Sequence, residues 1–232
     1  AALTVISGRA EMKVWGSQDF VSAPTGSILR EGDALKVFPS SRVSLTFLNG
    51  SYLRTDADTL LAFTGLRTKD GQDEMDLLME YGDVWLKKPK SENVKIAFTI
   101  TTDDFTVNSV STVFAVSKRQ DFRVRVLQGN VDVHVEEKVE SGKTNVIETI
   151  PVSVGQEFIA SSETLQAFRE RKAPEVIFAH SDSFRQGEWY AWNMTQDSEA
   201  KEATLSVEEA AKEETKAVTA VTQAPKTPAA ST

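Results

Sequence analysis

The sequence predicts an all-β fold: a wound antiparallel β-sandwich or roll, closed by a C-terminal helix and followed by a flexible tail. Three observations support this prediction. Apolar and polar residues alternate with a period of two over much of residues 3–160, as in half-buried strands. Turn residues separate these runs at intervals of about 8–12 residues, which is typical of a sandwich or barrel. An aromatic-rich segment then precedes residues 197–232, which contain no aromatic residue.

The first strand pair surrounds an Asn-Gly dipeptide. Apolar and polar residues alternate from Val43 to Phe47, which predicts a half-buried strand. The dipeptide Asn49-Gly50 follows, and it predicts a type I′ turn because both central positions of that turn need a positive φ. Residues 51–54 are then the returning strand of a predicted hairpin.

Further alternating runs predict strands between residues 96 and 135. Their inward-facing members are Ile96, Phe98 and Ile100; Phe105 and Val107; Val110, Thr112, Phe114 and Val116; Phe122, Val124 and Val126; and Val131, Val133 and Val135. No long helical period interrupts these runs, which disfavours a parallel sheet of βαβ units. The acidic stretch 70–74 and the pair Asp103-Asp104 are expected in solvated turns rather than in a metal site.

A weak internal repeat begins each time with glycine and continues as an alternating strand. Three copies start at Gly8, Gly82 and Gly129, and a second short pattern surrounds Gly32 and Gly155. Glycine at a strand entrance predicts a left-handed or tightly turned backbone, which other residues resist. The repeat therefore indicates strands wound in similar coils around one core.

The chain changes character after about residue 162. Pro174 and residues 176–178 indicate a connector, and Ser183 with Gln186 is typical of a helix N-terminus. We therefore divide the chain into a β domain over 1–162, a connector with an aromatic helix over 163–196, and a disordered or partly helical Ala/Glu/Lys/Thr tail over 197–232.

The aromatic helix is the first candidate for a partner-binding surface. It contains Trp189, Tyr190 and Trp192, which cannot all lie on one helix face because neighbouring residues are about 100° apart. We expect the helix to pack its main aromatic face on the β domain and to leave a residual patch for a partner.

Composition excludes several classes of function. With 26 Lys+Arg against 34 Asp+Glu, the net charge is −8, so the chain lacks the cationic field that nucleic acids or a polybasic membrane anchor require. The absence of cysteine excludes thiol catalysis and thiolate metal sites. His134 and His180 are far apart, so neither a histidine-rich metal centre nor a Ser-His-Asp site is expected. No run of about 18 uncharged apolar residues predicts a membrane span, and no cofactor is expected.

Two groups of residues are candidates for a glycan or anion site. Arg123 and Arg125 lie on one predicted strand, and guanidinium groups bind carboxylate or phosphate through paired hydrogen bonds. The alternative is that these cations pair with acidic residues on the neighbouring strand. Trp15 and Trp85 lie on glycine-led strands, where each could stack on a sugar; the alternative is packing in the core or at an edge.

Several motifs recur in a recognisable order. They are GSILREGDAL at 26–35, SRVSLTFLNGS at 41–51, YGDVW at 81–85, VSTVFAV at 110–116, VLQGNVDV at 126–133 and VGQ at 154–156. Their order and spacing resemble the FecR domain family, the extracytoplasmic domain of bacterial iron-uptake regulators and of many other exported proteins. Ser111 stands where that family usually has glycine before the threonine, so an altered turn is expected there.

The resemblance implies a non-catalytic recognition domain in the bacterial envelope, since the family offers no catalytic residues. The expected partner is another envelope protein, in signal relay or surface assembly, bound by β-augmentation at an exposed strand edge or by the aromatic patch. The first alternative is a module that binds cell-wall polysaccharide or another glycan, and the second is a weak hydrolase. Small residues at the front, Ala1-Ala2, suit the end left by removal of a signal peptide or anchor, which also predicts a location in the periplasm or at the cell surface.

Overall fold

The computed structural model describes residues 1–69, 71–88, 95–110, 112–138 and 144–198. The chain is mostly β, as predicted, with a short helical segment near its C-terminal end. It divides into two compact units, Ala1–Ser181 and Asp182–Thr232, which are described separately. The predicted tail falls almost entirely outside the described residues.

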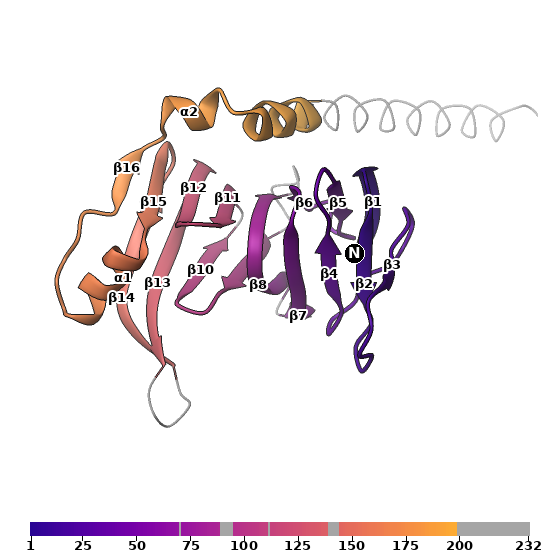
Figure 1. The fold of residues 1–232 in the computed structure, drawn as a ribbon, viewed down its shortest axis with the longest axis horizontal. Helices are drawn as coiled ribbons and strands as arrows, with labels where there is room; N and C mark the ends of the chain where they lie inside the picture. Colours follow the sequence, from indigo (N-terminus) through magenta and orange to yellow (C-terminus); the bar gives the residue numbers. More distant parts are fainter. Residues whose placement is uncertain (70, 89–94, 111, 139–143, 199–232) are drawn as a thin grey trace, which may run out of the picture. The chain divides into compact units, whose positions relative to one another are not determined.

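The first unit contains two layers of strands (Figure 1). We call them sheet A and sheet B. The strands of sheet A are, in spatial order, β1 (Ala2–Ser7), β5 (Arg42–Thr46), β6 (Tyr52–Thr55), β8 (Gln72–Lys87), β11 (Val113–Lys118), β12 (Phe122–Gln128), β15 (Gln156–Ala160) and β16 (Ile177–Ala179). The strands of sheet B are β3 (Val21–Ser22), β2 (Ala10–Lys13), β4 (Ala34–Val37), β7 (Thr59–Lys69), β8 again, β9 (Lys95–Thr101), β10 (Phe105–Val110), β13 (Asn130–Lys138) and β14 (Thr144–Ser153).

Strand β8 belongs to both sheets. Its first part, up to Tyr81, pairs with β7 in sheet B, and its second part, from Gly82, pairs with β11 in sheet A. Within the described residues every strand pair is antiparallel, as predicted, except β8 with β9, which run parallel. The chain leaves β8 in sheet A and returns beside the start of β8 in sheet B, so β9 must run in the same direction.

The chain passes between the sheets at residues with a positive φ. Six such crossings are described, at Gly8 (φ 69°), Ser40 (58°), Asp58 (50°), Gly82 (117°), Gly129 (80°) and Gly155 (81°). This confirms the backbone that the glycine-led repeat predicts. The crossings also pack on one another: a Cβ on Gly82 would lie 2.2 Å from Oγ1 of Thr59, and a Cβ on Gly8 would lie 2.1 Å from Oγ of Ser41.

One apolar core fills the space between the sheets. Phe105 of β10 stacks on Phe122 of β12 with ring centroids 4.4 Å apart, and Phe98 of β9 meets Phe114 of β11 edge-on at 6.0 Å. The predicted inward-facing residues of β9, β12 and β13 are buried in this core. The prediction is wrong for Val110, which is 56% exposed, because it ends one strand instead of continuing into the next.

The hairpin at Asn49-Gly50 forms, but not with the predicted turn. Only Gly50 has a positive φ (80°), so the turn is not type I′. The N–H of Gly50 donates to the carbonyl of Phe47 at 2.9 Å, and the N–H of Phe47 donates to the carbonyl of Ser51 at 3.0 Å. The side chain of Asn49 accepts from the N–H of Ser51 instead, so the loop contains three residues rather than two.

The structure adds a helix and a strand that the sequence did not predict. Helix α1 (Ser162–Arg169) begins at Ser161, whose Oγ accepts from the N–H of Thr164 at 3.3 Å, and buries Phe168. The predicted connector contains the short edge strand β16. Both elements are too short for a clear period in the sequence.

The second unit begins with two helical segments. Helix α2 (Asp182–Arg185) is separated by residues 186–187 from a second helix over 188–198, so the predicted single helix is interrupted. The N–H of Gly187 donates to the carbonyl of Phe184 at 3.1 Å, which closes the first helix. Ser183 lies inside α2 rather than at its N-cap, a difference of one or two residues.

Candidate functional site

The open strand edges are the first candidate for a binding surface. Strands β3 and β16 are edges of two and three residues. The outer side of β1 is covered, because the N–H of Leu3 donates to the carbonyl of Ser27 at 2.9 Å and Leu3 accepts from the N–H of Gly26 at 2.8 Å. Strand β14 has ten residues, and within the described residues no strand pairs with its outer side.

The register shows which backbone groups of β14 face this open side. The N–H of Glu136 in β13 donates to the carbonyl of Asp104, away from β14. The backbone groups of successive residues in a strand point to alternate sides. Val133 is three positions from Glu136, so its N–H and carbonyl point to the other side, toward β14, as do those of every second residue along β13. Their partners include Ile150, and the intervening Thr149 and Pro151 turn their backbone groups to the open side. Proline has no N–H, so Thr149 is the donor in this half of the edge.

The side chains of β14 divide between the core and the surface. Val152 is fully buried, and Ile147 and Ile150 pack against the core from partly buried positions. Val146 is 54% exposed and lies beside a register shift opposite Val135 and Glu136, where the strand bulges. The edge is therefore anchored at its C-terminal end and presents an apolar side chain nearer its start.

Trp15 occupies a different part of the molecule from the other glycan candidates. It lies just beyond the end of β2, so it is in a turn and not on a strand as predicted. The ring is 77% exposed. Its backbone N–H donates to Oδ1 of Asp33 at 2.9 Å, and the carboxylate of Asp33 is buried. A hollow of about 470 Å³ adjoins the ring and is also lined by Glu31, Gly32 and Thr64.

Trp85 and Arg125 lie in one row across sheet A. The register places Trp85 of β8 opposite Ala115 of β11, and Ala115 opposite Arg125 of β12. Trp85 lies on the opposite face of β8 from Val84 and Leu86, which flank it and belong to the core cluster, but its side chain is itself fully buried, at 0% exposed. Burial favours the alternative, packing, over an open sugar-stacking position. Trp15 is not part of this row.

Both candidate arginines have ion-pair partners. Nε of Arg125 lies 2.7 Å from Oε2 of Glu157 on the neighbouring strand β15, and the two side chains are 14% and 3% exposed. Nη2 of Arg123 lies 2.7 Å from Oδ2 of Asp121. The first pair joins neighbouring strands and the second is local. Both agree with the alternative interpretation, in which these arginines pair with acidic residues of the chain.

The neighbouring cation Lys118 is paired as well. Its Nζ lies 2.9 Å from Oδ2 of Asp103, in the turn between β9 and β10. This hydrogen bond, followed by the charge of Lys118, lowers the pKa of Asp103 below its ordinary value. The pair is an electrostatic link between the two sheets, because β11 lies in sheet A and the turn joins two strands of sheet B.

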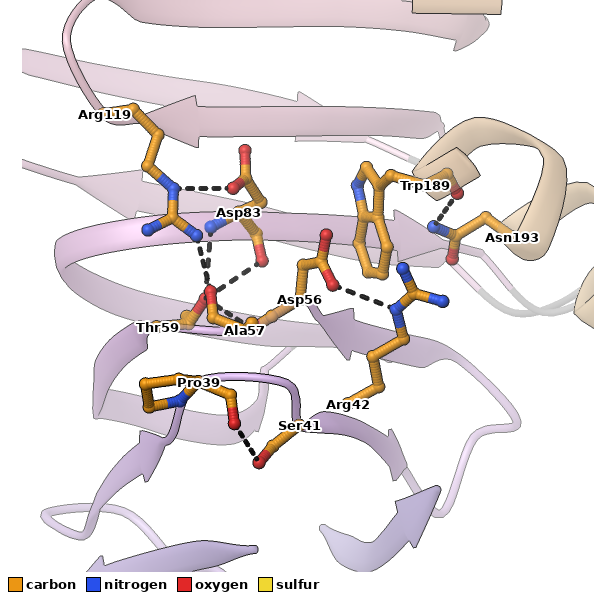
Figure 2. Close-up of polar contacts among 10 residues, drawn as sticks. All are labelled: Pro39, Ser41, Arg42, Asp56, Ala57, Thr59, Asp83, Arg119, Trp189 and Asn193. Carbon is orange, nitrogen blue, oxygen red and sulfur yellow. Dashed lines mark hydrogen bonds and ion pairs between the residues drawn. The ribbon is translucent and has the colours of Figure 1, made fainter. Parts of the chain in front are cut away.

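A polar network braces two neighbouring crossings (Figure 2). Oγ1 of Thr59 donates to the carbonyl of Asp56 at 2.8 Å and accepts from the N–H of Asp83 at 3.2 Å. Arg119 pairs with the carboxylate of Asp83 at 2.8 Å, and Arg42 pairs with Asp56 at 2.9 Å. These contacts stabilise the turns at which the chain changes sheet. The guanidinium of Arg119 is part of this network, because Asp83 binds it.

The three aromatic residues of the second unit point in two directions. Trp189 and Trp192 stack with centroids 5.3 Å apart and ring planes 15° apart. Tyr190 instead meets Phe184 edge-on at 5.2 Å. The side chain of Asn193 donates to the carbonyl of Trp189 at 2.9 Å (Figure 2). The prediction that the three aromatics cannot share one helix face is confirmed.

The acidic residues that line a pocket are also engaged. A hollow of about 210 Å³ is lined by Asp73 and Glu74, among others. Asp73 accepts from the side chains of Asn49 at 2.7 Å and Thr68 at 2.6 Å. Oε2 of Glu74 lies 2.7 Å from Nε of Arg67, and the hydrogen bonds of Arg67 to Glu74 and Asp76 raise the pKa of its guanidinium above the ordinary value. Both carboxylates of this hollow are therefore held by neighbouring side chains of the chain itself.

Among the residues that the structure describes, no group of three or more His, Cys, Asp or Glu residues could hold a metal ion. His134 lies on an outer face, with Nδ1 2.9 Å from Oγ1 of Thr149. No helix in the described part of the chain is long and apolar enough to cross a membrane.

Sequence reasoning missed two of these features. The β14 edge was not identified, although Pro151 within an alternating run was an available signal, since proline in sheets favours edge strands. The surroundings of Trp15 were also missed, because Asp33 and Gly32 are 17–18 residues from it in the sequence and meet it only through the fold.

Comparison with solved structures returned crystal structures of a putative anti-sigma factor from Parabacteroides distasonis. Two of them are 16% and 15% identical to this chain, with TM-scores of 0.48 and 0.47. The match covers 66% and 65% of this chain but only 65% and 61% of those chains, so this chain spans less than two thirds of their length. Comparison with curated proteins found no match.

A family model matches the central part of the chain. The model described as FecR protein matches residues 33–132, which run from the end of the turn before β4 into β13. The wound sheets continue on both sides of the match, into β1 and β2 and into β14 and β15. The central part of the chain, residues 33–132, is therefore similar to a FecR domain, in agreement with the resemblance that its motifs predict.

Proposed function

We propose that this protein is a non-catalytic, extracytoplasmic recognition domain that relays a signal in the bacterial envelope by binding another envelope protein. The FecR match supports a role in signal relay and a regulatory rather than enzymatic task. The same mode of binding could also serve in the assembly of a surface structure. That role would differ from signal relay only in the identity of the partner.

The open edge of strand β14 is the main support for this proposal. A strand of ten residues with one open side offers backbone donors and acceptors to an extended segment of a partner. The exposed side chain of Val146 supplies an apolar contact beside that edge. Pro151 interrupts the row of donors, so the partner strand pairs chiefly with the part of β14 that precedes it.

The stacked pair Trp189 and Trp192, together with Tyr190 on another face of the same helix, is proposed as a second contact for the partner. Aromatic side chains contribute much of the energy of many interfaces because they bury a large area in few rotamers. Removing the segment that contains these residues is expected to weaken partner capture, and unchanged capture would assign the segment a structural role only.

Site-specific photo-crosslinking in the native organism tests the edge. A photoreactive amino acid at Val146 is expected to form a covalent adduct with the partner, whereas one at Val154 is not. Val154 is a matched control, because it is 60% exposed but lies beyond the end of β14. Equal adducts at both positions, or none at Val146, would contradict the proposal.

A backbone substitution provides the second arm of this test. Thr149→Pro removes the N–H that faces the open side, and it is expected to weaken partner binding about tenfold, an amount typical of one lost hydrogen bond. Thr149→Val keeps that N–H and should bind like the original protein. Equal binding by the two variants, at equal thermal stability, would exclude pairing at this edge.

A further inference from the structure

The indole of Trp15 rests on the backbone of Gly32. Gly32 has a φ of 89°, and a Cβ built there would lie 2.2 Å from Cδ1 of the indole, so the two groups are in close contact. The N–H of Gly32 donates to the carbonyl of Phe63 at 2.7 Å, and the N–H of Phe63 donates to the carbonyl of Asp33 at 2.9 Å. The surface under the ring is therefore held by strand β7 and is not a loose loop.

The carboxylate of Asp33 fixes the other side of the turn. It is 2% exposed and accepts from two backbone groups, the N–H of Trp15 at 2.9 Å and the N–H of Arg30 at 2.8 Å. A buried carboxylate used in this way holds Trp15 in place although its ring is 77% exposed. An exposed ring of this size leaves a large apolar area in water, and here that area is presented on a rigid base.

Polar groups line the hollow beside the ring. Oε2 of Glu31 accepts from the N–H of Leu66 at 3.0 Å, which orients the carboxylate along the edge of β7. Among the described residues Oε1 of Glu31 has no hydrogen-bond partner, and Thr64 lines the same hollow. The volume of about 470 Å³ falls within the range of about 300–1,000 Å³ that small-molecule sites occupy.

We infer that this hollow binds a neutral saccharide, with one pyranose ring stacked on Trp15 and its hydroxyls bonded to Glu31 and Thr64. A pyranose has an apolar face of C–H groups and a rim of hydroxyls, which matches a flat aromatic face with oxygen acceptors beside it. The inference is independent of the proposed function, because the site lies beside β2 and β7 and does not involve the β14 edge.

Charge selects among the possible ligands. The carboxylate of Glu31 and the net charge of −8 disfavour a uronic acid or a phosphorylated glycan. A cation on the face of Trp15 is the competing ligand, since an indole face also attracts cations. A neutral saccharide needs Glu31 only as a hydrogen-bond acceptor, whereas a cation needs its charge, and a variant can separate the two cases.

Titration of the full chain with cellotetraose and with tetra-N-acetylchitotetraose, followed by calorimetry and ligand-observed NMR, tests the inference. Binding of at least one oligosaccharide is expected, and Trp15→Ala should weaken it at least about tenfold, as loss of a stacking partner implies. Trp15→Phe keeps an aromatic face and should stay within about threefold of the original protein. Leu48→Ala is the matched control, because Leu48 is fully exposed in the turn between β5 and β6 and does not line this hollow, so its loss should change nothing.

Glu31→Gln distinguishes the ligand classes. It keeps an oxygen acceptor and should stay within about threefold for the neutral oligosaccharide. Binding of tetramethylammonium that is lost in Glu31→Gln, without oligosaccharide binding, would overturn the inference in favour of a cation site. Absence of oligosaccharide binding, or equal binding by Trp15→Ala, would also overturn it, and neither result bears on the β14 edge.

Discussion

Single residues with a left-handed backbone decide where this chain changes sheets. Gly82 is the most constrained of them, because its φ of 117° is rarely adopted by other residues and Thr59 occupies the space of a Cβ. Ser40 and Asp58 make equivalent crossings without glycine, at φ values of 58° and 50°. Sequence inspection could find the glycines from their repeat, but Ser40 and Asp58 carry no comparable signal.

Substitution of Gly82 measures the importance of this crowding. Gly82→Ala is expected to lower the free energy of unfolding by about 2–4 kcal/mol, since the backbone is strained and the Cβ meets Thr59. Gly155→Ala is the control: Gly155 also has a positive φ (81°) but has no atom within 4 Å of the added Cβ, so a loss of about 1–2 kcal/mol is expected from the backbone alone. Urea unfolding followed by far-UV circular dichroism measures both, and equal losses would show that packing at the crossing is unimportant.

Some strands can be predicted from the sequence pattern and others cannot. Strands β9 and β12 alternate regularly, so their buried residues could be read directly from the pattern. Strand β8 could not be predicted in this way, because it changes sheet at Gly82 and no single face stays buried along its sixteen residues. The edge position of β14 depends on which strands pair, and pairing is a property of the whole topology.

The ion pair between β12 and β15 provides a test at the level of paired strands. Glu157→Gln is expected to lower the free energy of unfolding by about 2–4 kcal/mol, because Glu157 and Arg125 are largely buried and the substitution removes one charge of the pair. Chemical denaturation of the single and double variants at positions 125 and 157 gives the coupling energy of the pair.

An exposed pair supplies the comparison. Lys172 and Glu170 lie 2.6 Å apart, with side chains 69% and 44% exposed, so Glu170→Gln should leave unfolding unchanged within error. If Glu157→Gln also left the free energy of unfolding unchanged, the ion pair between β12 and β15 would contribute nothing measurable to stability.

Among the described residues, one extensive core lies within the first of the two units. All buried members of the core cluster lie between Leu3 and Val176, inside the first unit. The sequence predicted the fold class of this unit because alternation and turn spacing report on sheets in general. It did not predict the two-sheet path of β8 or the parallel β8–β9 pair, because those depend on where the chain returns after leaving a sheet.

Truncation tests whether the first unit is self-sufficient. A chain ending at Ser181 is expected to unfold in one cooperative transition, with fluorescence and circular dichroism giving coincident curves, because the core is complete within it. A chain ending at Ala160 removes Phe168 and Val176 from the core and should be measurably less stable. A chain ending at Ser181 that lacked near-UV circular dichroism would refute the expectation.

The continuity of β8 has a mechanical consequence. A pull on the outermost strand of sheet B passes sideways through β13, β10 and β9 into β8, and then along the covalent backbone of β8 into sheet A. An extended backbone is already near its full length and lengthens little under tension. A load applied at one margin of the domain is therefore transmitted to the opposite layer through the covalent backbone of β8.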